Sequence, residues 1–144
     1  MTIIHAKEKI MNLSATFLRI TASLTMLIFH GYPKLINFSA YATSFPDPLG
    51  VGSATSLALV IFAEFFCSIL IILGAATRLA CIPLIFTMMI AFFVIHGSDP
   101  FSVKELAFLY LLTFIAIFIS GSGSFSLKLS RLFTNNKILS FLSD

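Results

Sequence analysis

The stretch LALVIFAEFFCSILIILGAA, from Leu57 to Ala76, decides the fold class of this chain. Its length matches the ~20 residues that a helix needs to cross the ~30 Å hydrocarbon core of a bilayer. Lipid offers no partner to backbone amides, so a run of this kind crosses the membrane as a helix. Glu64 is its only charged residue, and this carboxylate needs an explanation.

Three further apolar runs accompany the first, and the composition of the whole chain agrees with them. The 144 residues are 58% hydrophobic and only 10% charged, with a mean hydropathy of +1.03, whereas soluble domains have about 25% charged residues. A chain this short has too little polar surface to cover such helices in water. We therefore predict one all-α membrane domain over residues 1–144, a four-helix transmembrane bundle with helices at about 11–30, 56–76, 79–96 and 105–121.

The basic residues predict the orientation of this bundle, because Lys and Arg collect in short cytoplasmic loops. With four crossings, both termini and the 77–78 turn share one side of the membrane. That side holds most of the basic residues, namely Lys7, Lys9, Arg78, Lys128, Arg131 and Lys137, whereas the other side holds Lys34 and Lys104. We expect both termini in the cytoplasm and a multi-pass protein of a bacterial cytoplasmic (inner) membrane.

Two segments outside the helices have mixed patterns. Gly31 and Pro33 predict that the first helix ends at His30, which leaves an outer loop over residues 31–55. The cytoplasmic tail, 122–144, mixes polar residues with an apolar set, and it is either an amphipathic surface segment or a loosely ordered tail. That apolar set is Phe125, Leu127, Leu129, Leu132, Phe133, Ile138 and Leu142.

Arg19 and Glu64 are the charged residues deepest in the predicted helices. At 1.5 Å per residue they lie roughly 16 Å and 12 Å from the outer ends of their helices. A charge at the bilayer centre costs about 2.5–3.5 kcal/mol on insertion scales, so such groups turn inward and find partners. We predict a buried Arg19–Glu64 ion pair. Side chains lean toward the N-terminus of their helix, which points these two apart, so the pair needs a water or an unusual rotamer.

Further polar residues fall near the outer ends of the helices: His30, Lys34, His96 and Glu105. We predict an outward-facing polar pocket built from them, with Arg19 and Glu64 at its floor. Thr77 and Arg78 mark the turn between the second and third helices. Cys67 and Cys81 form no C-x-x-C motif, so the sequence supports no dithiol centre and no metal site, and no residue stands out as catalytic.

Together these residues resemble the DoxX-like family of small integral membrane proteins. The resemblance implies a four-helix membrane protein, and some relatives are described as subunits of quinone-linked or thiol-redox assemblies. Cys67-Ser68 stand where the family often has paired glycines, Ser122 replaces a proline, and Lys128 replaces an acidic residue. The matching elements, in order, are Arg19, Gly31-Tyr32-Pro33-Lys34, Glu64, Leu73-Gly74, Thr77-Arg78, His96, Glu105, Tyr110-Leu111 and Gly121-Ser122-Gly123.

Several functions stay open at this point. We expect a non-catalytic subunit or partner of a membrane redox assembly, which would not be an enzyme on its own. The alternatives are a quinone or small-molecule site in the bundle and a proton or solute pathway through Glu64 and His96. A haem held by His30 and His96 is disfavoured, because a histidine at a helix end more often caps carbonyls. The sequence requires no cofactor; the expected partners are the lipid bilayer, a redox-enzyme subunit or a second copy of the chain, and not nucleic acid.

Overall fold

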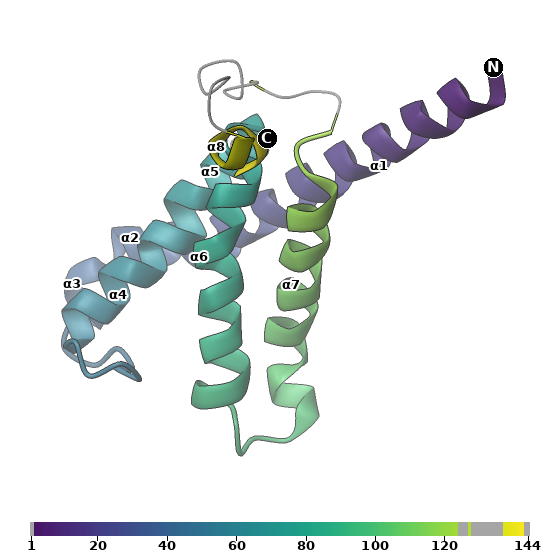
Figure 1. The fold of residues 1–144 in the computed structure, drawn as a ribbon. Coiled ribbons are helices and arrows are strands. Elements are labelled where there is room, and N and C mark those ends of the chain that lie inside the picture. The colour runs from purple at the N-terminus through teal and green to yellow at the C-terminus, as the bar shows by residue number, and fades with distance from the viewer. Residues whose placement is uncertain (1, 124–126, 128–136, 143–144) are drawn as a thin grey trace.

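The computed structural model describes residues 2–123, 127 and 137–142 (Figure 1). All regular elements of these residues are helices. Four stretches are long and apolar enough to cross a membrane, which confirms the predicted fold class of a four-helix membrane-spanning bundle. These spans are Ile4–Ile36, Ser53–Leu73, Thr77–Ile95 and Phe101–Ser120.

The first span consists of α1 (Thr2–Met26), the π-helical turn η1 (Leu27–Gly31) and α2 (Tyr32–Ile36). It continues past His30, where the sequence pattern ended it, through Gly31 and Pro33. The π turn widens the helix there, and the Tyr32 N–H bonds to the Leu27 carbonyl. Pro33 then stands in the first turn of α2, a position that tolerates a missing N–H donor. A short helix, α3 (Phe38–Tyr41), follows.

The second span consists of α4 (Ser53–Ile61), η2 (Phe62–Cys67) and α5 (Ser68–Leu73). It ends at Gly74, whose φ of 68° is the left-handed conformation that closes many helices. The Gly74 and Ala75 N–H groups bond back to carbonyls of the last turn of α5. The polypeptide therefore reverses within three residues and starts the third span at Thr77.

The third span consists of α6 (Thr77–Met89) and η3 (Ile90–Ile95), and α7 (Phe101–Ser120) forms the fourth. A further short helix, α8 (Lys137–Leu142), lies beyond the spans. We call the end of the bundle with the α5–α6 turn the Arg78 end, and the end with the turn between η3 and α7 the His96 end. Each span other than the fourth contains one π-helical turn, and no sequence pattern predicted these turns.

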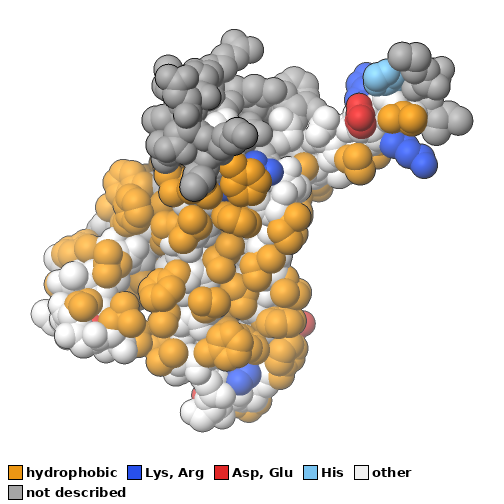
Figure 2. Space-filling view, viewed as in Figure 1, with side chains coloured by type: hydrophobic (Ala, Val, Ile, Leu, Met, Phe, Trp, Pro, Cys, Tyr) orange, Lys and Arg blue, Asp and Glu red, His pale blue; other side chains and the backbone are white. Residues whose placement is uncertain are grey.

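The spans pack closely on one another in one part of the bundle and diverge in another. α1 packs against α5 and α7, and α6 packs against α7. α4 packs instead against α2 and α3, and Figure 1 shows it leaving α6 toward the His96 end. Hydrophobic side chains cover much of the bundle on the face shown in Figure 2, as lipid contact favours. The buried core consists of Met26, Ala63, Cys67, Ile71, Ala80, Cys81, Leu84, Met88, Leu111, Phe114 and Ile117.

Candidate functional site

A cavity of about 560 Å³ lies where the spans diverge. All four spans line it, and its walls are mostly apolar. Its volume falls within the roughly 300–1,000 Å³ that small-molecule sites occupy, and such sites combine apolar walls with a few convergent polar groups. The polar side chains around this cavity come from His30, Lys34, Ser56, Glu64, Thr87, His96 and Tyr110.

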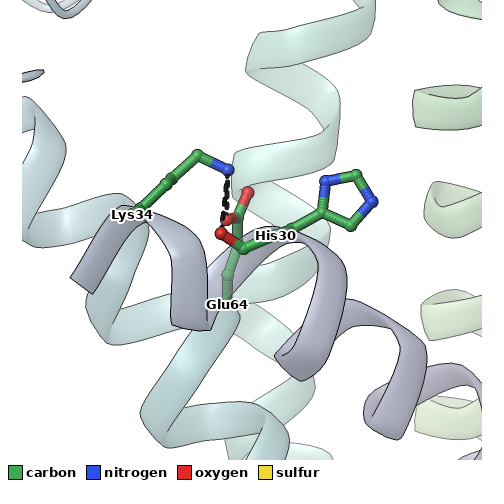
Figure 3. A network of polar contacts seen from close by, with 3 residues as sticks. All are labelled: His30, Lys34 and Glu64. Carbon is green, nitrogen blue, oxygen red and sulfur yellow. Dashed lines mark hydrogen bonds and ion pairs between the residues drawn. The ribbon is translucent and has the colours of Figure 1, made fainter. Parts of the chain in front are cut away.

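The central polar feature of the cavity is an ion pair between Lys34 and Glu64. Lys34 Nζ lies 2.6 Å from a Glu64 carboxylate oxygen, and the two side chains are 22% and 5% exposed. The same ammonium lies 3.4 Å from the main-chain carbonyl of His30. Figure 3 shows Lys34 and Glu64 pointing toward one another, with the His30 ring turned away from the pair. Each charge compensates the other, which is what a low-dielectric site requires of buried charges.

A close approach of two helices at Gly31 brings this pair together. A Cβ atom at Gly31 would lie 2.6 Å from both atoms of the Glu64 backbone carbonyl. No side chain fits at that distance, so only glycine lets the first span touch the backbone of the second. Lys34 lies one turn after Gly31 on the same helix, and its side chain therefore reaches the carboxylate.

The three π-helical turns among the described residues all contribute to the cavity. His30 belongs to η1 and Glu64 to η2, while Ile90, Ala91 and Ile95 belong to η3. A π turn inserts a residue into the helix and re-aims the side chains around it, and such turns are frequent at functional sites. Their gathering at one cavity favours a functional role for it.

The two histidines of the cavity have different partners. The His30 ring makes an edge-to-face contact with the Tyr110 ring, with centroids 5.5 Å apart. His96 Nδ1 lies 2.8 Å from a carboxylate oxygen of Asp99, in the turn after the third span. His30 therefore packs on an aromatic wall of the cavity, whereas His96 is held at the end of its helix.

The loop of residues 42–52, which we call the covering loop, lines the cavity at the His96 end. Four of its apolar residues line the cavity: Phe45, Pro46, Pro48 and Leu49. Between them, the Asp47 carboxylate accepts hydrogen bonds from Ser56 Oγ at 2.6 Å and from the N–H groups of Gly52 at 2.7 Å and Val51 at 3.0 Å. The Ser56 hydroxyl, followed by these main-chain donors, lowers the pKa of Asp47. The sequence did not assign these contacts to Asp47, because it lies five residues before Gly52, the N-cap of α4, and no local pattern marks its partners.

Arg19 lies away from the cavity, and Glu64 takes its cation from Lys34 instead. The Arg19 side chain is buried, and its Nη1 donates to the carbonyls of Ile71 at 2.6 Å and Ile72 at 2.7 Å. These carbonyls belong to the last turn of α5, whose acceptors lack partners within the helix. The predicted Arg19–Glu64 pair must be corrected for a physical reason. Side chains lean toward the N-terminus of their helix, so Arg19 points to the Arg78 end and Glu64 to the His96 end.

The remaining predicted residues lie outside the cavity. Arg78 Nε donates to the Phe118 carbonyl at 3.0 Å, and its guanidinium stacks over the Phe141 ring at 4.1 Å. Thr77 is fully buried at the start of α6. Glu105 is exposed and does not line the cavity, so the pocket unites His30, Lys34 and His96 without it. Of the predicted amphipathic tail, Phe125, Leu129, Leu132 and Phe133 lie outside the described residues.

Comparison with known proteins agrees with the resemblance read from the sequence. The model of the DoxX family matches residues 14–97, which is more than half of the chain and includes Arg19, Lys34, Glu64 and His96. No curated protein and no solved structure matches the chain. With its four membrane-spanning helices and this family match, the chain belongs to the DoxX family.

Proposed function

We propose that this DoxX protein holds a small amphiphilic molecule of the quinone class in its cavity, as a non-catalytic subunit or partner of a membrane redox assembly. The observation that carries the proposal is the buried Lys34–Glu64 ion pair, which faces an apolar cavity of about 560 Å³. An ion pair that served packing alone would not need an open space beside it.

The chemistry of the cavity fits a ring that carries carbonyl or hydroxyl groups. The Lys34 ammonium has three N–H donors, and Glu64 accepts one of them at 2.6 Å. A quinone carbonyl would accept another, and the Tyr110 hydroxyl is a further donor among the residues that line the cavity. Hydrogen bonds of this kind are stronger in a low-dielectric site than in water. The apolar walls would enclose the rest of the ring.

The role in a redox assembly follows from the class of ligand. A quinone carries electrons between membrane enzymes, so a protein that holds one would serve such enzymes as a subunit or partner. We assign the His96 end to the outer side of the membrane, because Lys7, Lys9 and Arg78 belong to the opposite end. The ligand would then lie in the outer half of the bilayer.

Purification in a mild detergent, followed by solvent extraction and mass spectrometry, tests the proposal. The matched variants are Lys34→Met/Glu64→Gln, which removes both charges of the pair, and Lys104→Met, which removes a lysine outside the cavity lining. Wild type and Lys104→Met should retain a quinone in stoichiometric amount, and the double variant should lose it. Equal retention by all three proteins, or retention by none of them, would contradict the proposal.

A second candidate function, a proton pathway, has an observation of its own. Ser23 and Ser68 are fully buried, and their hydroxyls have no hydrogen-bond partner among the described residues. Ser68 lies one turn beyond Glu64, so these hydroxyls extend the polar region toward the Arg78 end. Proteoliposomes with an internal pH dye would show proton uptake that Ser68→Ala abolishes; uptake equal to that of empty liposomes would remove this candidate.

A further inference from the structure

The covering loop lines the cavity at the His96 end, on the side of the aqueous phase. Its apolar residues Phe45 and Leu49 face the cavity, and Asp47 fastens it to Ser56 of α4 through a hydrogen bond of 2.6 Å. A molecule that arrived from water would have to displace this apolar segment and break the hydrogen bonds of Asp47. A molecule from water would therefore meet the covering loop, whose Leu49 is 49% exposed, before it reached the cavity.

A second side of the cavity lies between α4 and α6, within the membrane spans. α4 packs against α2 and α3, while α6 packs against α7, and the two helices diverge (Figure 1). Leu59 and Phe62 line the cavity from the second span and are 50% and 51% exposed. Phe86 lines it from α6 and is 47% exposed. These three side chains line the cavity and are half exposed within two spans, so they mark a mouth of the cavity within the membrane, whereas the half-exposed Leu49 faces the aqueous end.

The surroundings of this mouth are hydrocarbon. Leu59 lies within the span Ser53–Leu73 and Phe86 within the span Thr77–Ile95. The outer face around these helices carries hydrophobic side chains, as Figure 2 shows for one side of the molecule. A molecule at the mouth is therefore already dissolved in the bilayer.

We infer that the cavity fills from the bilayer, through the mouth between α4 and α6, and that its ligand carries a long apolar tail which stays in this mouth. This inference rests on the proposed function and names the class of ligand more closely. The head group binds at the Lys34–Glu64 pair, and the tail passes between Leu59 and Phe86 into the lipid. A soluble molecule with the same head group would contact the Lys34–Glu64 pair but would make no contacts between Leu59 and Phe86.

The test uses the full-length protein in lipid nanodiscs and two probes with the same quinone ring, one with a long isoprenoid tail and one without a tail. The mouth variant Leu59→Trp/Phe86→Trp narrows the opening, and Leu59→Ala/Phe86→Ala widens it. The control Phe66→Trp/Ile82→Trp adds the same bulk to the same spans at exposed positions that do not line the cavity. Association rate and dissociation constant are measured for each protein and probe.

We expect the narrowed mouth to weaken binding of the tailed probe by about tenfold or more and to slow its association, while the widened mouth speeds it. The dissociation constant of the tail-less probe, and all constants of the control, should stay at their wild-type values. Wild-type rates and affinities in both mouth variants would overturn the inference and leave the proposed function standing. Faster binding after Asp47→Ala alone would also overturn it, because the ligand would then pass the covering loop. Failure of wild type to bind either probe would overturn the proposed function as well.

Discussion

The two ends of the bundle bind buried and partly buried cations in different ways. At the Arg78 end, Arg19 donates to the carbonyls of Ile71 and Ile72, and Arg78 donates to the Phe118 carbonyl. Both arginines thus meet the last turn of a neighbouring helix, where acceptors are available and the helix dipole is negative. At the His96 end, Lys34 meets the carboxylate of Glu64 beside a cavity.

This difference supports a structural role for the Arg78 end and the proposed binding role for the His96 end. Main-chain carbonyls are fixed by the helix that carries them, so the arginine contacts to these carbonyls hold helices in place. An ammonium and a carboxylate on side chains can each turn toward a further partner, the ammonium as a donor and the carboxylate as an acceptor. The end with fixed acceptors is packed, and the end with movable groups is hollow, which is why we assign the ligand to the His96 end.

The largest loss of stability is expected at the packed end, from Arg19→Met. Hydrogen bonds from a charged donor are worth about 1.5–3 kcal/mol each, so losing two of them should cost about 3–6 kcal/mol. Unfolding by sodium dodecyl sulfate in mixed micelles measures this cost. Arg19→Lys, which keeps one cation at the site, should lose clearly less.

Quinone binding by the Arg19→Met variant tests the same difference between the two ends of the bundle. Molecules of Arg19→Met that remain folded should bind the quinone probe as wild type does, because Arg19 does not line the cavity. A stability equal to that of wild type, or selective loss of binding, would show that the two ends do not differ as we describe.

The next largest effect is expected from Glu64→Gln, which leaves Lys34 without its carboxylate. Breaking a buried ion pair costs about 3–5 kcal/mol, and the partial exposure of Lys34 favours the lower limit. The double variant Lys34→Met/Glu64→Gln should regain most of the stability that Glu64→Gln loses, because replacing both charges of a buried pair is often neutral. If the double variant were as unstable as the single one, the pair would not explain the effect; melting curves in detergent decide this.

A smaller loss is expected from Gly31→Ala. The added Cβ would meet the backbone of Glu64, and overpacking of this kind costs about 1–3 kcal/mol. The same variant should weaken quinone binding, because the helices that carry Lys34 and Glu64 move apart. Ala58→Val adds bulk at an exposed position of α4 and should stay within about 0.5 kcal/mol of wild type. Equal melting temperatures for Gly31→Ala and wild type would argue against the close approach.

The smallest effect is expected from pH, through Asp47 in the covering loop. Hydrogen bonds from Ser56, Gly52 and Val51 lower the pKa of this carboxyl in the folded protein. Its contribution to stability is therefore fully present above the unfolded pKa of about 3.9 and is lost as pH falls through the lowered folded pKa. Melting temperatures from pH 6 to pH 3 should fall more steeply for wild type than for Asp47→Asn; parallel curves would contradict this role.

The sequence predicts the fold and part of the site, for reasons that individual residues make clear. Hydropathy alone located the spans, because lipid imposes helices on any apolar run of about 20 residues. It also marked Arg19 and Glu64 as buried charges, and it placed Lys34 and His96 at one end. The predicted pairing of Arg19 with Glu64 was wrong, because it gave more weight to their similar depth than to the direction in which side chains lean along a helix.

Other features lacked a sequence signal. No residue pattern in the sequence predicted the π turns. One of them carries the first helix through Gly31 and Pro33, which are residues that ordinarily end a helix. This continuation is what brings Lys34 onto Glu64. The cavity depends on the angle at which α4 leaves α6, which a linear pattern cannot express.

The most direct test of this account is the distance between the Lys34 ammonium and the Glu64 carboxylate in membranes. Rotational-echo double-resonance NMR on protein with ¹⁵Nζ-lysine and ¹³Cδ-glutamate measures it, and Lys34→Met identifies the signal. We predict strong dipolar dephasing of the Glu64 carboxylate by lysine, as a contact of 2.6 Å requires, that disappears in Lys34→Met. Dephasing of Glu64 by ¹⁵N-labelled arginine instead, abolished by Arg19→Met, would contradict the account.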